Sequence, residues 1–305
     1  MNTEAIQISQ LNLSLKEKFL SLHHSPGIFN TAIPNLNLSL HEDVNCMHKC
    51  FDKPLVGLVL QGTKHSTLGG HDFVYSQNQS LVASVDMPIS SYIVSASKAK
   101  PFLFIYLYLD KVMLADLVKE LPWDNSDKEN PEAVSICDTN ADIMEMFLRL
   151  LNLSSKPEQI AMRAPMMVRE LYYLLLLSPH GKLLRQINTP GTKNHQVDFA
   201  VNWLKENYKE DLAIENLAKN SHMSKANLYR NFKLFTGLSP LQYQKQLRLY
   251  EARRQIVTEN KRILNAALDV GYESISQFNR EYKRLFGEPP LRDLNKTRAE
   301  ISINN

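Results

Sequence analysis

The sequence predicts an α+β chain of two domains, in which a β-barrel with flanking helices precedes an all-α domain with two helix-turn-helix units. Short apolar runs separated by turn residues fill residues 37–110, as expected of barrel or sandwich strands. Helical periodicity begins at about residue 112. Near the C-terminus, one pattern of serine, apolar, basic, glycine and proline positions occurs twice, 50 residues apart. A length of 305 residues agrees with two domains.

Residues 1–187 are expected to form the N-terminal domain, with the barrel at about 37–110 and helices over 111–187. A short helix over 12–22 precedes the barrel. The apolar runs expected to be strands are 55–60, 73–75, 81–85, 92–94 and 102–109. Two later segments each have one apolar helical face, formed by Ile143, Phe147, Leu150 and Leu151 and by Met167, Leu171, Leu174 and Leu175. Such faces either cover the barrel or pair with a second subunit.

The C-terminal part differs from the rest in charge. Residues 188–194 are the predicted linker, and 195–296 the predicted second domain. From Lys193 to Glu300 there are 19 basic and 13 acidic residues, whereas the rest of the chain has 16 and 19. A basic domain attached to an acidic one fits nucleic-acid binding confined to one end of the chain.

The first copy of the repeat predicts an amphipathic helix between Ser224, a suitable N-cap, and Gly237, a suitable C-terminal stop. Its buried face is predicted to consist of Leu228, Phe232 and Phe235, which follow helical spacing. The residues expected to point outward are Ala226, Tyr229, Arg230 and Lys233.

The second copy has the same design. Phe278, Tyr282 and Leu285 are expected to point inward, and the outward positions are Ser276, Gln277, Arg280 and either Lys283 or Arg284. Ser274 with Gln277 three residues later fits a capping box. The Gln277 side chain could instead face a base, but it could not easily do both.

A shorter apolar helix and a turn precede each copy, which is the helix-turn-helix arrangement. The apolar residues of these short helices are Ile214, Leu217 and Ala218 in the first unit and Ile263, Leu264, Ala267 and Leu268 in the second. Between the units, Ser239, Pro240 and Gln242 are helix-start signals. They predict one rigid joining helix, with Leu247 and Tyr250 on its buried side. Ordinary core helices with a solvated basic stripe are the alternative, which two copies in register disfavour.

The run from Gly271 to Arg292 resembles the signature of AraC/XylS-type transcription regulators, and the resemblance extends over roughly residues 197–294. Two positions depart from it. Tyr282 stands where phenylalanine is usual, and Asp293 lies where the usual aromatic–arginine pair is only partly kept. The second departure concerns packing more than reading.

The N-terminal half resembles the sensor domain of one AraC subgroup, through residues 54–64, 80–88 and 163–171. The resemblance implies a cupin-like β-barrel followed by helices. It leaves the small-molecule effector unidentified. Dimerisation is compatible with the apolar helical faces.

In this family the first unit meets DNA through positions matching Ala226, Tyr229 and Arg230, and the second through positions matching Ile275, Ser276, Gln277 and Arg280. Lys233 shares the outer face of the first helix. The two arginines could read guanine or hold phosphate. Ala226 and Ile275 could contact a thymine methyl group. Two such helices would enter successive major grooves about 34 Å apart, bending the DNA to fit.

We therefore expect a bacterial-type, cytoplasmic, sequence-specific transcription regulator. It would bind double-stranded DNA, respond to a small molecule and, as the family likeness favours, activate transcription through RNA polymerase. One alternative is a DNA-binding regulator whose barrel only dimerises and binds no small ligand. Another is a cupin-type metalloenzyme with an appended DNA-binding domain. A barrel filled by side chains would favour the first alternative, and a bound metal the second.

Other activities find little support in the residue patterns, so we expect neither an enzyme nor a resident cofactor or metal. There is no His-x-His pair of the kind cupin enzymes use, and no Gly-x-Ser-x-Gly. Cys46 and Cys50 flank His48, but no second pair accompanies them, which favours packed thiols over a redox or zinc site.

The N-terminus and the cysteine content suit a cytosolic protein. The chain begins Met1-Asn-Thr-Glu, with no charged and apolar leader. The longest apolar stretches, 102–109 and 171–177, are too short to span a bilayer. Three cysteines suit a reducing compartment.

Overall fold

The computed structural model describes residues 3–44, 47–68, 71–121 and 132–303, with side chains up to residue 296. They divide into two compact units, the first mainly up to His195 and the second from Gln196 onward. Within the described ranges, no helix combines the length and apolar character that a membrane span requires.

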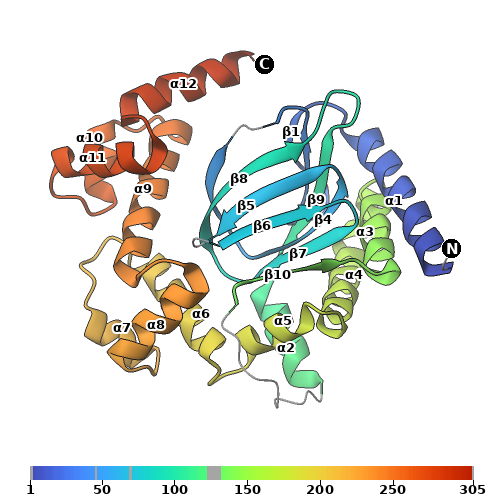
Figure 1. Cartoon of the computed structure of the whole chain (residues 1–305), viewed down its shortest axis with the longest axis horizontal. Coiled ribbons are helices and arrows are strands. Elements are labelled where there is room, and N and C mark those ends of the chain that lie inside the picture. The colour runs from blue at the N-terminus through green and yellow to red at the C-terminus, as the bar shows by residue number, and fades with distance from the viewer. Residues whose placement is uncertain (1–2, 45–46, 69–70, 122–131, 304–305) are drawn as a thin grey trace. The chain divides into compact units, whose positions relative to one another are not determined.

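The described strands form two sheets (Figure 1), and all of them belong to the first unit except Lys49–Phe51 of β3, which group with the second. One has six strands in the order β1-β2-β9-β4-β7-β10, all paired antiparallel. The other has four, in the order β3-β8-β5-β6. The strands are β1 (Gly27–Asn30), β2 (Leu36–His41), β3 (His48–Asp52), β4 (Leu55–Gln61), β5 (Thr63–Leu68), β6 (His71–Ser76), β7 (Gln79–Ala83), β8 (Met87–Ser95), β9 (Phe102–Tyr108) and β10 (Val134–Asp138).

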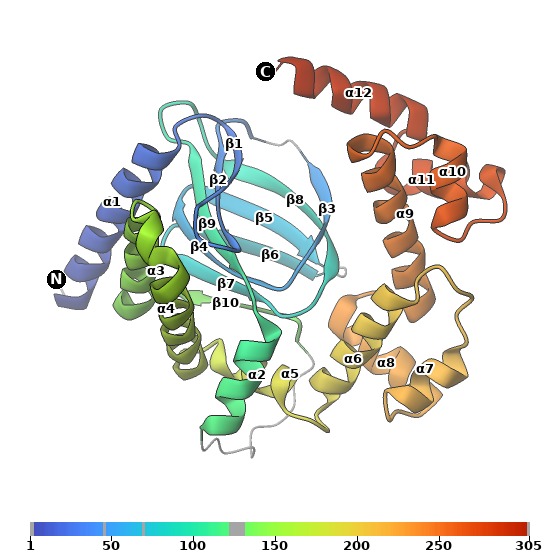
Figure 2. The same ribbon diagram turned by 180° about the vertical axis from the view of Figure 1, so that it is seen from behind.

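Helices α1 (Thr3–Leu22), α3 (Ala141–Leu153) and α4 (Pro157–Leu177) cover one face of the six-stranded sheet (Figure 2). Alternate residues of β2, β4 and β9 point to that face, because successive strand residues alternate sides. They form one core with both predicted helical faces, so those faces cover the sheet. Two further helices, α2 (Lys111–Glu120) and α5 (Gly181–Asn188), complete this layer.

The opposite face of β9 carries an aromatic stack that occupies the space between the two sheets. The rings of Phe102 and Phe104 lie 6.1 Å apart and those of Phe104 and Tyr106 5.5 Å apart. Tyr75 of the four-stranded sheet lies 6.4 Å from Phe104. A Cβ on Gly57 would come within 2.1 Å of the Phe104 ring, so only glycine fits there. The expected cupin-like domain is therefore present as two sheets rather than one closed barrel. Aromatic side chains fill the space between the sheets, which on the criterion above favours a barrel that holds no ligand in its interior.

Several elements differ from the sequence prediction. Strand β10 lies within the region expected to be wholly helical. The sequence does not reveal it, because its five residues form a strand at the sheet edge only by pairing with β7. Strand β5 reads Thr-Lys-His-Ser-Thr-Leu and has no apolar run to reveal it, yet it pairs with both β6 and β8. Strand β1 and the first half of α1 were also not predicted.

The second unit is helical. Helices α7 and α8 form the first helix-turn-helix and α10 and α11 the second, with α9 between them (Figure 1). The bounds are α6 (Lys193–Glu206), α7 (Ile214–Asn220), α8 (Lys225–Thr236), α9 (Pro240–Thr258), α10 (Ile263–Asp269), α11 (Ile275–Phe286) and α12 (Pro290–Ile303). The predicted linker, 188–194, includes the end of α5 and the start of α6.

A fully buried histidine ties the edge of the six-stranded sheet to the start of α5. His180 Nε2 lies 2.8 Å from Ser80 Oγ and 3.2 Å from Cys137 Sγ, and its Nδ1 lies 2.9 Å from Ser135 Oγ. Burial lowers the pKa of His180 to about 4 and raises the pKa of Cys137. Both groups are therefore neutral at pH 7, which suits a packed thiol rather than a reactive one.

The other two cysteines, Cys46 and Cys50, are the pair that flanks His48 in the sequence. Cys46 lies outside the described residues, whereas Cys50 is in β3. The packed-thiol interpretation of that pair stays a prediction.

We predict that acid destabilises the first unit through His180. The unfolded chain gains a proton at an ordinary histidine pKa of about 6.5, whereas the folded His180 stays neutral down to about pH 4. The free energy of unfolding should thus be greatest above pH 6.5 and fall as the pH drops towards 4. The shift sets an upper limit of about 3 kcal/mol on this fall.

Urea unfolding at pH 7.5 and 4.5 measures this effect. His180→Asn should make the pH dependence shallower, whereas His71→Asn, at an exposed position, should leave it as in the parent. The pH dependence that remains in the His180→Asn variant includes the contribution of His41, because burial also lowers the pKa of His41 to about 4. An unchanged slope in the His180 variant would contradict the assignment.

Candidate nucleic-acid interface

Helix α8 presents its predicted outer face to solvent. Ser224 caps it by accepting the Asn227 backbone N–H at 3.2 Å, and Gly237 ends it with a φ of 71°. Leu228, Phe232 and Phe235 are at most 4% exposed. The side chains left on the exposed face include Ala226, Tyr229, Arg230 and Lys233, as expected.

Helix α11 repeats this construction. Ser274 accepts the Gln277 N–H at 3.3 Å, and Gly287 ends the helix with a φ of 87°. Phe278 and Tyr282 are fully buried. The Gln277 side chain donates to Glu281 at 3.2 Å instead of completing a capping box. It therefore stays on the exposed face, together with Ile275, Ser276 and Arg280.

The cationic side chains of these faces are available to a polyanion. Arg230 donates to the neutral amide of Asn227 at 2.9 Å. Among the described residues, no carboxylate forms an ion pair with Arg230, Lys233 or Arg280. Arg280 and Lys283 also line a surface hollow of about 380 Å³ beside the start of α12. Phosphate binding would therefore not require breaking an internal salt bridge.

The joining helix α9 begins as predicted, with a complete capping box between Ser239 and Gln242 and a proline at its first position. Its buried side differs from the prediction, because Leu247 and Tyr250 are only half-buried. Its buried apolar positions include Tyr243, Leu249, Ala252 and Ile256. The cause is that α9 has two neighbours along its length, so no single apolar stripe describes it.

The two ends of α9 pack on different units. The ring centroids of Tyr243 and of Phe232, which belongs to the first helix-turn-helix, lie 5.4 Å apart. Leu249, Ala252 and Ile256 belong to the core of the second helix-turn-helix. In that core α10 buries Ala266 and Ala267, whereas Leu264 and Leu268, expected among its apolar contacts, are 54% and 55% exposed.

Arg248 of α9 was not singled out by its sequence pattern, yet it contacts four backbone carbonyls. Its Nε donates to Tyr208 O at 2.6 Å, and its Nη2 to Lys209 O and Glu210 O at 3.0 and 2.9 Å. Its Nη1 donates to Gly271 O at 2.9 Å. One guanidinium thus joins the loop before α7 to the turn between α10 and α11.

The turn at Gly271 requires glycine. Its φ is 88°, and a Cβ there would lie 2.4 Å from Lys209 O. In the first unit, His222 takes the corresponding turn with a φ of 53°. Histidine tolerates that region at some cost, but only glycine allows the close approach in the second unit.

Two acidic residues fasten the second reading helix to its neighbours. Glu281 accepts from Tyr272 Oη at 2.7 Å and from Lys245 Nζ at 3.0 Å. Asp293 accepts both arms of Arg253, at 2.7 and 3.0 Å, and Tyr282 Oη at 2.7 Å. Burial pushes the pKa of each carboxyl up, but these donors hold it below its ordinary value. Both groups are therefore ionised at neutral pH.

Tyr282 and Asp293, the two departures from the family signature, thus bind each other. In the part of the chain that the structure describes, no group of three or more His, Cys, Asp or Glu could hold a metal ion.

Comparison with protein families finds two matches. Residues 32–183 match the N-terminus of AraC-type transcriptional regulators, and residues 217–296 match a helix-turn-helix domain. The second match contains α8 and α11.

Individual relatives are distant. The transcriptional activator RhaS of Pectobacterium carotovorum is 25% identical over 177 residues, which is 58% of this chain and 62% of that protein. AdaA of Bacillus subtilis, a transcriptional activator and DNA repair enzyme, is 29% identical over 40% of this chain and 58% of its own length. The chain thus matches less than two thirds of these relatives.

A solved structure shares the fold. An apo variant of ToxT from Vibrio cholerae has a TM-score of 0.59 at 11% identity, over 87% of this chain and 98% of that chain. ToxT with a bound unsaturated fatty acid has a TM-score of 0.58 at 9% identity, over 85% and 94% of the two chains.

We predict that Arg248→Met lowers the free energy of unfolding of the C-terminal compact unit, which begins at Gln196. Four carbonyls would lose a charged donor, and hydrogen bonds to charged groups are individually strong, so the expected loss is about 2–4 kcal/mol. Arg254→Met, on the same helix, removes an arginine that is 52% exposed and pairs with Glu251 and Glu259; it should cost less than about 1 kcal/mol. Urea unfolding with amide hydrogen exchange resolves the two units. Equal losses in both variants would refute the role of Arg248.

Proposed function

Because this chain belongs to the AraC-type family of transcription regulators, we propose that it binds double-stranded DNA sequence-specifically and controls transcription in response to a small molecule. The observation that carries this proposal is the pair of exposed cationic helix faces in one unit, both attached to α9. A rigid pair of reading helices suits a duplex, because groove spacing demands a defined separation.

The proposed contacts divide between the two helices. In α8 they are Ala226, Tyr229, Arg230 and Lys233, and in α11 they are Ile275, Ser276, Gln277 and Arg280. Arginine can pair with guanine through two parallel hydrogen bonds, and glutamine with adenine. Lysine on the same face supplies phosphate attraction. The absence of carboxylate partners around these cations in the described residues supports both roles.

In this proposal residues 1–187 sense the effector and dimerise, 188–194 link the domains, and 195–296 read DNA. The protein acts in the cytoplasm as a regulator without enzymatic activity, and it activates transcription by contact with RNA polymerase. The names of the relatives RhaS and AdaA support activation. The ToxT structure with a fatty acid supports the existence of an effector for this fold.

A homodimer is supported by an apolar stripe on α4. Met162, Met166, Tyr173 and Leu177 share one side of the helix and are 76%, 62%, 40% and 58% exposed. Arg169 lies at the middle of the same side, between Met166 and Tyr173, where it pairs with Glu120, and the neighbouring Glu170 pairs with Arg149. Exposed apolar side chains beside ion pairs are typical of a helix-to-helix contact between subunits.

We predict that DNA selected from a random pool contains two short conserved boxes spaced by one helical turn. Arg280→Ala should weaken binding to the selected sequence by about 1–3 kcal/mol if Arg280 reads a base, and should relax one position of one box. Titration of the selected duplex and of a scrambled one, monitored by fluorescence anisotropy, measures both effects.

Lys119→Ala is the matched control for loss of a positive charge, because Lys119 lies on α2 in the other unit and its side chain is 67% exposed. It should leave both titrations unchanged. An equal loss on both duplexes in the Arg280 variant would assign that side chain to phosphate contact. If the DNA selected from the random pool contains no conserved box, the proposal of sequence-specific binding is wrong.

We further predict that Met166→Glu converts the dimer into a monomer, because it places a carboxylate without a partner beside the exposed Met162 on the α4 stripe. Val74→Glu is the control, since Val74 is a comparably exposed apolar residue, at 59%, on β6. Sedimentation velocity gives the masses. A chain that is monomeric before any substitution would contradict the dimer outright.

A further inference from the structure

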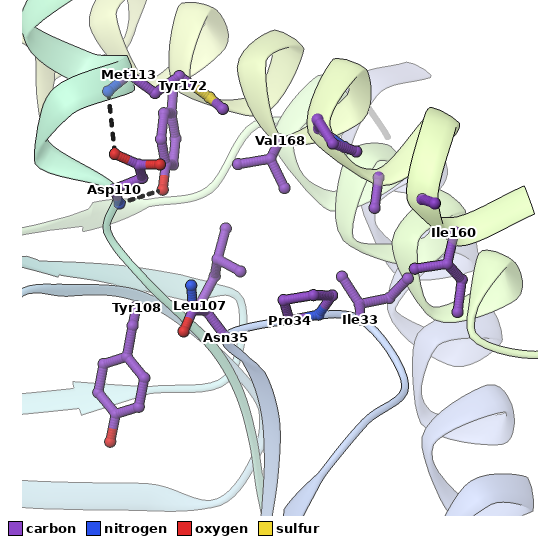
Figure 3. Close-up of a pocket in the computed structure, with 13 residues that line it drawn as sticks. Ile33, Pro34, Asn35, Leu107, Tyr108, Asp110, Met113, Ile160, Val168 and Tyr172 are labelled. Atoms are coloured by element: carbon purple, nitrogen blue, oxygen red, sulfur yellow. Dashed lines mark hydrogen bonds between the residues drawn. The ribbon is translucent and has the colours of Figure 1, made fainter. Parts of the chain in front are cut away.

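A pocket lies outside the space between the two sheets, on the helix-covered side of the first unit (Figure 3). Its volume is about 210 Å³. Its walls come from the turn before β2, the end of β9 with the start of α2, and the middle of α4. Tyr172 and Asp110 lie at one end of it and Ile160 at the other (Figure 3).

Small residues on α4 create this space. Ala161, Ala164 and Pro165 line the pocket within little more than one helical turn. A leucine or phenylalanine at any of these positions would occupy part of the volume. Opposite them, Asn35 has a φ of 67°, which turns the chain back into β2 and leaves Ile33 and Pro34 as the facing wall.

Asp110 is the charged residue of the lining, whereas Asn35, Tyr108 and Tyr172 are neutral and can donate as well as accept hydrogen bonds. Asp110 uses Oδ1 to cap α2, accepting the N–H groups of Val112 and Met113 at 3.0 Å each; neither cap bond uses Oδ2. Pro165 has no N–H, so the Ala161 carbonyl lacks its usual helical partner. Among the lining residues there is no Lys, Arg or His. The net charge of the lining is therefore negative, which favours a cationic ligand over an anionic one.

Volume and polarity together define a ligand class. An apolar cavity of about 150 Å³ accepts benzene, whereas drug-sized ligands need about 300 Å³ or more. We propose that this pocket is an effector site for a small hydrophobic amine, one ring or a branched chain in size, whose apolar body lies against Ala161, Ala164 and Val168 and whose amino group faces Asp110.

The regulatory part of this inference rests on the proposed function. Helix α4 presents the pocket lining on one side and the exposed stripe of Met162 and Met166 on a nearly opposite side. A ligand that presses on α4 near Pro165 would also displace the stripe. Occupancy of the pocket would thereby change pairing between subunits and, through it, affinity for DNA.

Isothermal titration calorimetry of the full chain at pH 7, without DNA, tests the site with three probes of equal shape. Benzylamine should bind about tenfold more tightly than benzoate, with benzyl alcohol between them, because Asp110 attracts the first and repels the second. Asp110→Asn keeps a capping side chain but should weaken benzylamine about fivefold, leaving benzyl alcohol unchanged. Ala161→Phe should abolish the binding of all three probes. Val112→Phe is the control, because Val112 is exposed and lies outside the pocket, and it should leave the binding of every probe unchanged.

The proposal is overturned if no probe binds at millimolar concentration, if benzoate binds as well as benzylamine, or if Ala161→Phe binds as the parent does. Lys53 lines a neighbouring pocket beside Tyr108; benzoate binding that Lys53→Met removes would place an anion site there instead. With DNA added, benzylamine should shift the affinity of the parent chain but not that of Ala161→Phe. No shift would remove the effector role. A chain that binds no DNA would refute the proposed function while calorimetry still decides the site.

Discussion

The geometry of the second unit depends on one side chain, Arg248. Its planar guanidinium can reach several acceptors at once because its donors are arranged as a fork. Three of its partners belong to the loop before α7, and the fourth is Gly271 in the turn before α11. The two helix-turn-helix units are thereby held to the same point on α9. Without such a tie, each helix-turn-helix would still pack on α9, but the loop before α7 and the turn before α11 would lose their common donor.

Charged pairs complete what Arg248 begins, and they do so with residues that the family signature does not require. Tyr282 keeps the aromatic packing of a phenylalanine while its hydroxyl donates to Asp293. Asp293 in turn accepts two hydrogen bonds from Arg253 of α9. A buried carboxylate is costly unless donors surround it, and here three donors do. The two departures are therefore one compensated change that joins α9, α11 and α12. Among the described residues, the side chains on the outer face of α11 form no hydrogen bond with another side chain apart from that of Gln277 with Glu281.

In the first unit, the two faces of the six-stranded sheet have different roles. The face toward the second sheet is filled by the stack of Phe102, Phe104 and Tyr106, an arrangement that Gly57 permits. The face toward the helices carries the large aliphatic core and, at its margin, the pocket beside α4. Helix α4 is the element common to the core, the pocket and the exposed stripe. A proline in its middle lowers the cost of bending at that point, which makes it the natural place for a ligand and a second subunit to influence each other.

What could be read from the amino-acid sequence was local. The caps at Ser224, Ser239 and Ser274, the stops at Gly237 and Gly287, and the outward stripes with Arg230 and Arg280 follow from helical period and capping chemistry, which depend on residues a few positions apart. Only tertiary structure decided the rest. Strands β5 and β10 exist because of their partners, α9 buries Tyr243 and Leu249 because two units pack on it, and the pocket arises where three distant segments meet. Arg248 illustrates the reason: its partners lie 23 to 40 residues away, and no local pattern encodes a contact whose two sides are brought together only by folding.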